Sequence, residues 1–182
     1  MLKEPRPGRV KTRLGKDIGH VAAASWFRHQ SADLIRRLRD PRWSLTLAVT
    51  PDTAISSRVW PMSQQRLGQG TGDLGERMAR VFRSAPPGPV CIVGADIPAI
   101  ETSHIAEAFS RLGDHDAVFG PAPDGGFWLV GVKHANPLPA GLFQGVRWSS
   151  PHALADSVAT FGDCRVGYCA QLRDVDTVDD LP

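Results

Sequence analysis

Apolar and amphipathic segments alternate along this chain of 182 residues. Apolar side chains recur at helical spacing over residues 20–39, where Pro41 then ends the pattern. Short apolar runs at 44–49 and 90–93 are typical of strands, and the second is apolar enough for a strand covered on both faces. Residues 51–71 are polar and interrupted by Pro51 and Pro61.

Similar patterns continue to the end of the chain. They predict helices at 73–84, 102–112 and 151–161 and strands at 116–120, 127–132 and 165–172. Alternation of strands and helices is typical of an α/β fold with a mostly parallel sheet. No repeat, linker or low-complexity segment interrupts the pattern, so we expect a single domain over residues 1–182.

Composition narrows the class of protein. Hydrophobic residues make up 42% of the chain and the net charge is only +2, which argues against disorder. No stretch approaches the ~20 apolar residues of a membrane helix, and the N-terminus lacks the apolar core of a signal peptide. The three cysteines, Cys91, Cys164 and Cys169, lie in apolar or strand-like surroundings, which favours buried free thiols in a reducing compartment. We therefore expect a cytoplasmic protein with no membrane partner.

Positive charge is concentrated at the start of the chain and negative charge at its end. Residues 3–16 carry six Lys or Arg and one acid, whereas residues 174–180 contain four aspartates. A basic segment can be a solvated tail, or it can bind nucleic acid or a phosphorylated small molecule. Pro5, Pro7 and Gly8 shape this one as a loop. No aromatic residue precedes Trp26, so stacking platforms are missing and we expect no nucleic-acid partner.

Acidic residues follow two predicted strands and lie near the end of the chain. Asp96 comes after strand 90–93, where it could hold a divalent cation or form a turn. Residues 123–126 (Pro-Asp-Gly-Gly) could let the backbone approach a ligand or could form a hairpin turn. Asp174 and Asp176 would share one face of an extended segment, where a cation relieves their repulsion; an exposed acidic terminus is the alternative. With the basic loop, these acids suit a metal-bound nucleotide diphosphate.

A rival motif lies at residues 70–75, where Gly-Thr-Gly-Asp-Leu-Gly matches the G-x-G-x-x-G pattern of dinucleotide sites. That pattern should follow a buried strand, and the preceding residues 62–67 are too polar for one. A dinucleotide oxidoreductase would also leave residues 123–126 unexplained. The chain has no P-loop motif, no serine-hydrolase elbow and no zinc-type spacing of His and Cys, which argues against those classes.

Short motifs lie in consistent order over nearly the whole chain, at residues 5–14 (Pro-Arg-Pro-Gly-Arg-Val-Lys-Thr-Arg-Leu), 72–78, 94–98, 120–129 with 131, 148–149, 174–177 and 179–181. Together they resemble the nucleotide-diphospho-sugar transferase superfamily. Within the superfamily the motifs are similar to arsenosugar-biosynthesis-type glycosyltransferases. Lys-Thr-Arg-Leu at 11–14 and Asp-Val-Asp-Thr at 174–177 also resemble phospholactate guanylyltransferases and, more loosely, molybdenum-cofactor guanylyltransferases. The resemblance implies a three-layer α/β/α fold of the glycosyltransferase-A type, and only Met1 and Leu2 precede Lys3, so most of its first strand is expected to be missing.

The resemblance also implies roles for individual residues. Asp96, Asp124 and Lys11 would be catalytic, and Asp96 and Asp176 would hold Mg²⁺ or Mn²⁺. The residues implied to bind the nucleotide or its diphosphate are Gly8, Arg9, Lys11, Arg13, Asp73, Glu76 and Arg77. The residues implied to meet the sugar or acceptor are Asp124, Gly125, Gly126 and Trp148.

Three functions follow as expectations. The first is metal-dependent transfer of a sugar from a nucleotide diphosphate sugar to a small-molecule acceptor. The second is a nucleotidyltransferase that joins an NTP to a phosphorylated or acidic metabolite and releases pyrophosphate. The third is a truncated protein that binds a nucleotide without catalysis.

Overall fold

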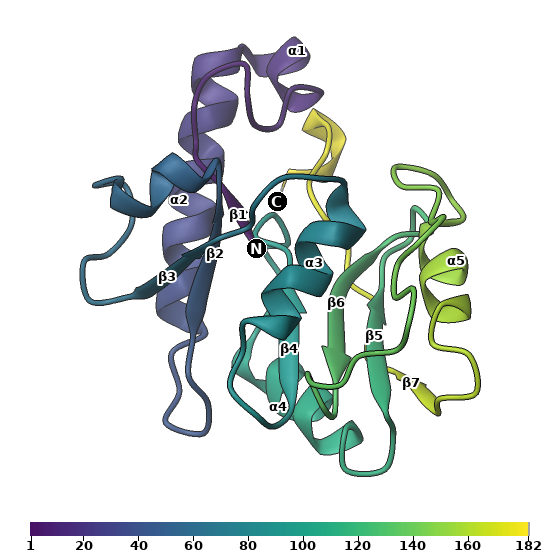
Figure 1. The fold of residues 1–182 in the computed structure, drawn as a ribbon. Coiled ribbons are helices and arrows are strands. Elements are labelled where there is room, and N and C mark those ends of the chain that lie inside the picture. Colours follow the sequence, from purple (N-terminus) through teal and green to yellow (C-terminus); the bar gives the residue numbers. More distant parts are fainter. Residues whose placement is uncertain (182) are drawn as a thin grey trace. The chain divides into compact units, whose positions relative to one another are not determined.

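The structure, a computed structural model, describes residues 1–181, which form two compact units. The first unit comprises Met1–Gln69, Gly94–Thr102 and the segment from Arg173 onwards; the second comprises Gly70–Val93 and Ser103–Leu172. Each unit combines strands with helices, which confirms the α/β class (Figure 1). The single domain expected from the sequence stays a prediction.

The first unit contains a parallel sheet in the order β1-β2-β3. Its strands are β1 (Leu2–Lys3), β2 (Thr46–Thr50) and β3 (Gln65–Gly68), and its helices are α1 (Leu14–Ile18), α2 (His20–Arg37) and the short 3₁₀ helices η1 (Asp52–Ser56) and η2 (Val178–Asp180). Helix α2 buries Ala23, Phe27, Leu34 and Ile35 from one stripe, which is the helical spacing that the sequence predicts.

The second unit contains a mixed sheet in the order β4-β6-β5-β7. Its strands are β4 (Val90–Val93), β5 (Ala117–Pro121), β6 (Phe127–Val132) and β7 (Val166–Tyr168), and its helices are α3 (Leu74–Arg83), α4 (Thr102–Arg111) and α5 (Ala153–Ala159). Strand β6 runs antiparallel to β4 and β5, whereas β5 and β7 are parallel. Counting β1–β2 and β2–β3, parallel pairings form the majority, as predicted.

The sequence argues against a buried strand at residues 62–67; the strand β3 (Gln65–Gly68) does form there, but none of its four residues is fully buried. Among the described residues β3 pairs only with β2, and an edge strand of this kind tolerates polar side chains. Arg66 also stabilises the loop that precedes β3. Its guanidinium donates hydrogen bonds to the carbonyl oxygens of Ile55 at 2.7 Å and Trp60 at 3.1 Å. A polar sequence therefore forms this strand through sheet pairing and one long side chain.

Strand β4 differs from its prediction in its surroundings. Only Ile92 is fully buried, while the other three residues of the strand are half-buried. An apolar run indicates a strand but does not specify its partner, and here the partner β6 is antiparallel.

Cys91, Cys164 and Cys169 are free thiols, although only Cys169 is fully buried. Within the described part of the chain, no helix combines the length and the apolar character that crossing a membrane requires.

Candidate functional site

The basic loop between β1 and α1 is shaped so that one lysine is directed inward. Buried Val10 and Leu14 anchor the loop, and the carbonyl of Lys11 accepts a 2.8 Å hydrogen bond from the backbone N–H of Gly15. Lys11 itself adopts a left-handed backbone conformation with φ of 44°, which few non-glycine residues do. Its side chain is only 7% exposed. The predicted diphosphate-binding residues Gly8 and Arg9 are exposed.

The segment that follows Arg173 brings its aspartates beside Asp96. Val175 is buried in a small apolar cluster with Leu14 and Ala23, and its backbone N–H donates to the carbonyl of Asp96 at 3.1 Å. Asp174 and Asp176 flank Val175 in the sequence, and both are half-buried. Asp96, Asp174 and Asp176 each present a carboxylate oxygen within 4.8 Å of the other two.

Ion pairs join the basic loop to these acids. The ammonium nitrogen of Lys11 lies 2.5 Å from Asp96 Oδ2 and 3.0 Å from Asp176 Oδ1. Arg13 Nη1 lies 2.8 Å from the other oxygen of Asp176. Burial by itself lowers the pKa of Lys11, but the charges and hydrogen bonds of Asp96 and Asp176 outweigh it, so the pKa lies above its ordinary value. Lys11 therefore carries a full positive charge.

We call Lys11, Arg13, Asp96, Asp174 and Asp176 the Lys11 cluster. Four of its members were predicted from the sequence as diphosphate or metal ligands, and the structure brings them together. Asp174, which the sequence pattern pairs with Asp176 as a possible cation site but which the resemblance leaves out of the metal ligands, lies with them. The three carboxylates could hold a divalent cation, and the two cationic side chains could bind an anionic ligand.

Asp180 holds the turn that carries Asp176. Its Oδ2 accepts hydrogen bonds from the backbone N–H of Thr177 at 2.9 Å, the hydroxyl of Thr177 at 2.9 Å and the backbone N–H of Asp176 at 3.2 Å. These bonds, those from Thr177 first, lower the pKa of Asp180 to about 2. The turn is thus stabilised by the ionised carboxylate.

The turn yields a pH-dependent prediction. Replacing Asp180 by Asn should destabilise the protein by about 1 kcal/mol at pH 7, because hydrogen bonds to a charged acceptor contribute about 1 kcal/mol more than those to a neutral one. Because the folded pKa lies below the ordinary value of about 3.9, this contribution should be complete above about pH 5, fall as the pH drops below about 4 and be lost as the pH falls through about 2. Urea unfolding of both proteins at several pH values measures it. A difference that persists unchanged at pH 2.5 would show that charge is not the cause.

In the second unit, three predicted nucleotide-binding residues meet at the start of α3. Asp73 Oδ1 accepts from the backbone N–H of Glu76 at 2.8 Å, and Glu76 Oε2 accepts from the backbone N–H of Asp73 at 2.9 Å. Arg77 Nε donates to the carbonyl of Asp73 at 3.1 Å. This arrangement is a capping box, which satisfies the first N–H groups of the helix. Their role toward a nucleotide stays a prediction.

The predicted sugar-binding residues Asp124, Gly125 and Gly126 form the hairpin turn between β5 and β6. Asp124 is exposed, and its Oδ1 accepts from the backbone N–H of Gly126 at 2.9 Å. Gly125 has a φ of 84°, and a Cβ there would lie 2.6 Å from the backbone of Pro151. Its carbonyl accepts from the N–H of Leu154 at 2.9 Å. The glycine is thus required where two backbone segments meet.

Trp148 packs among aromatic rings, 6.1 Å from Phe143 and 6.3 Å from Phe127 between ring centres. Gly75 lets α3 approach them, since a Cβ there would lie 2.6 Å from Phe143 and 2.9 Å from Trp148. This contact explains the last glycine of the G-x-G-x-x-G pattern by packing. Whether Trp148 meets an acceptor stays a prediction.

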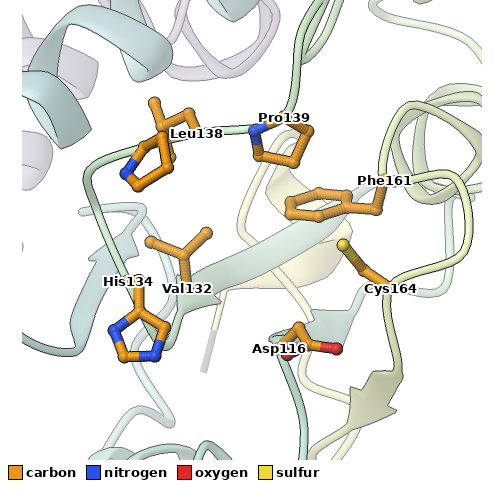
Figure 2. A pocket seen from close by; sticks show the side chains of 8 residues that line it. Asp116, Val132, His134, Leu138, Pro139, Phe161 and Cys164 are labelled. Carbon is orange, nitrogen blue, oxygen red and sulfur yellow. The ribbon is translucent and has the colours of Figure 1, made fainter.

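A cavity of about 330 Å³ lies in the second unit, at the end of the β5–β6 hairpin away from the Asp124 turn (Figure 2). It is lined by Asp116, Val132, His134, Pro137, Leu138, Pro139, Phe161 and Cys164. Most of this lining is apolar. None of the site residues that the sequence analysis proposes contributes to it. It is thus separate from the predicted sugar-binding turn.

Comparisons with known proteins agree with the fold. No curated protein matches the chain by sequence. The crystal structure of a protein from Desulfovibrio desulfuricans G20, which carries an inferred assignment as a nucleotide-diphospho-sugar transferase, matches with a TM-score of 0.87 and 29% sequence identity. The match covers 97% of this chain and 80% of the other, and it confirms the predicted nucleotide-diphospho-sugar transferase fold.

A family model also matches residues 33–150, which is more than half of the chain. The chain therefore belongs to the bacterial family described as "Uncharacterized protein conserved in bacteria (DUF2064)".

Proposed function

We propose that this protein is a metal-dependent glycosyltransferase that transfers a sugar from a nucleotide diphosphate sugar to a small-molecule acceptor. The observation that carries the proposal is the Lys11 cluster, in which two cationic side chains and three carboxylates meet. The similarity to the Desulfovibrio protein, whose assigned donor class is a nucleotide diphosphate sugar, supports the same class here. The free thiols support a reducing, cytoplasmic location.

The residues of the cluster fit a divalent metal ion. Carboxylate oxygens are the ligands that Mg²⁺ and Mn²⁺ prefer, and the ammonium of Lys11 already lies between two of these carboxylates as a cation would. Asp96 and Asp176 would hold the metal, with Asp174 as a third candidate. When bound, the metal would neutralise charge that develops on the departing diphosphate.

The cationic side chains would act on the same leaving group. Arg13 is 67% exposed, so its guanidinium can bind phosphate oxygens without unfolding the loop. Lys11 would place a second positive charge next to the metal site. Catalysis would then rest on positioning and on electrostatic stabilisation, which require no covalent nucleophile. Asp124, Gly125, Gly126 and Trp148 remain our candidates for the sugar and the acceptor.

A thermal-shift panel tests the proposal. UDP, GDP, CDP and ADP, their sugar conjugates and the NTPs are each added with Mn²⁺ or with EDTA. We expect a nucleotide diphosphate sugar to raise the melting temperature only with Mn²⁺, because a ligand that binds only the folded state stabilises it. A ligand at about 100 times its Kd contributes about 2.7 kcal/mol.

The other outcomes are equally informative. Preference for a triphosphate, followed by pyrophosphate release, would replace the glycosyltransferase with a nucleotidyltransferase. Equal shifts in EDTA would contradict metal dependence. No shift with any nucleotide would contradict both transferase functions.

A further inference from the structure

Lys11 occupies the position in the cluster where a metal ion would bind. Its ammonium contacts Asp96 at 2.5 Å and Asp176 at 3.0 Å, and these are the two carboxylates assigned to the metal. An ammonium and a divalent cation cannot both lie between the same oxygens, because like charges at that separation repel strongly. A metal must therefore displace Lys11 or bind to fewer oxygens.

Lys11 is also held more firmly than its neighbour. Its side chain is 7% exposed and bridges two carboxylates, whereas Arg13 is 67% exposed and, among the described residues, is ion-paired with one carboxylate, that of Asp176. Moving the ammonium into water would leave Asp96 and Asp176 beside each other without the charge that offsets their repulsion. The displaced ammonium would also need a new anionic partner, since it leaves two ion pairs.

A nucleotide diphosphate supplies that partner. Its phosphate oxygens can take up the ammonium of Lys11 while the metal takes up the carboxylates. Mg²⁺ is usually held by one or two carboxylates together with substrate phosphates rather than by protein ligands alone. The same exchange is unfavourable for a metal that arrives without phosphate.

We propose that Lys11 makes the binding of metal and nucleotide mutually dependent, so that the free protein binds the metal weakly and the nucleotide binds together with it. This inference rests on the metal site of the proposed function. The backbone of Lys11 stays in place, fixed by the hydrogen bond from Gly15, and the exchange involves its flexible side chain. Coupling between two ligands is reciprocal, so the metal strengthens nucleotide binding by the same factor.

Calorimetric titration with Mn²⁺ tests the inference without an activity assay. Mn²⁺ is titrated alone, and then with UDP, GDP, CDP or ADP present, into the wild type, Lys11→Met and Lys16→Met. Lys16 is an exposed lysine on α1 and serves as the matched control. For the wild type, we expect one of the nucleotides to strengthen Mn²⁺ binding about 5- to 150-fold, the usual range of such coupling.

The Lys11→Met variant should bind Mn²⁺ alone more tightly than the wild type, by about the same 5- to 150-fold, and gain little from nucleotide. Lys16→Met should match the wild type. Tight Mn²⁺ binding to the wild type without nucleotide, or equal or weaker binding to Lys11→Met, would overturn the inference while leaving the metal site intact.

Failure of the proposed function would look different. If Mn²⁺ binds none of the proteins with any nucleotide, the metal site itself is wrong and the inference falls with it. If Lys11→Met does not fold, as judged by circular dichroism, Lys11→Gln replaces it in the same titrations, because the coupling in the wild type alone does not assign the effect to Lys11.

Discussion

Replacement of Asp96 by Asn is expected to remove metal-dependent nucleotide binding and to lower sugar transfer by about a thousandfold or more. The side chain keeps its size but loses the charge that faces Lys11 at 2.5 Å and forms one corner of the carboxylate group. A catalytic metal stabilises transition-state charge by several kcal/mol, and each 1.36 kcal/mol corresponds to tenfold in rate. Binding is measured by calorimetry with Mn²⁺, and turnover by release of the nucleotide from its sugar conjugate.

The matched control is Asp179→Asn. Asp179 is an exposed acid in η2, close in sequence to Asp176, and belongs to no carboxylate group among the described residues. The Asp179→Asn variant should bind Mn²⁺ and nucleotide, and transfer the sugar, as the wild type does. Metal-dependent binding that survives unchanged in Asp96→Asn would show that Asp96 is not a metal ligand.

Replacement of Gly125 by Ala is expected to destabilise the protein by about 3 kcal/mol, the second large effect. The residue has a φ of 84°, which costs an L side chain about 1–2 kcal/mol. The added Cβ would also lie 2.6 Å from the backbone of Pro151, which cannot rotate away as a side chain can. Forcing extra volume into a packed position typically costs a further 1–3 kcal/mol. Urea unfolding measures the loss.

Gly145→Ala separates the two causes. Gly145 has a φ of 73°, but a Cβ there would meet no atom within 4 Å. The free energy of unfolding of Gly145→Ala should therefore fall only by the cost of the left-handed backbone conformation, about 1–2 kcal/mol. If both variants lose the same stability, the hairpin turn and the segment at Pro151 can separate to admit a methyl group.

Local patterns in the sequence predicted most of the secondary structure. The apolar stripe of α2 and the apolar runs of β4 and β6 coincide closely with the observed elements. These patterns succeed because periodicity reflects which side of an element is buried. The short helix α1 was missed, since its five residues offer barely one turn of pattern inside a basic loop.

Strand pairing lay beyond such patterns. The polar strand β3 is specified by its hydrogen bonds to β2, and the antiparallel partner of β4 by a hairpin that begins more than twenty residues later. The residues of β3 and β4 do not themselves indicate which strand each of them pairs with. The capping box at Asp73 shows the opposite case, where a local motif assigned to nucleotide binding also has a complete structural role.

The sequence by itself determined the α/β class, the main helices and strands, and the residue types from which a metal-diphosphate site can be built. It also placed basic residues at one end of the chain and acidic residues at the other. Only the tertiary structure decided that they meet, with Lys11 and Asp176 in contact across 165 positions of sequence. The physical reason is that Val175 packs into the apolar cluster of Leu14 and Ala23, and this long-range burial turns the flanking aspartates toward Lys11 and Asp96.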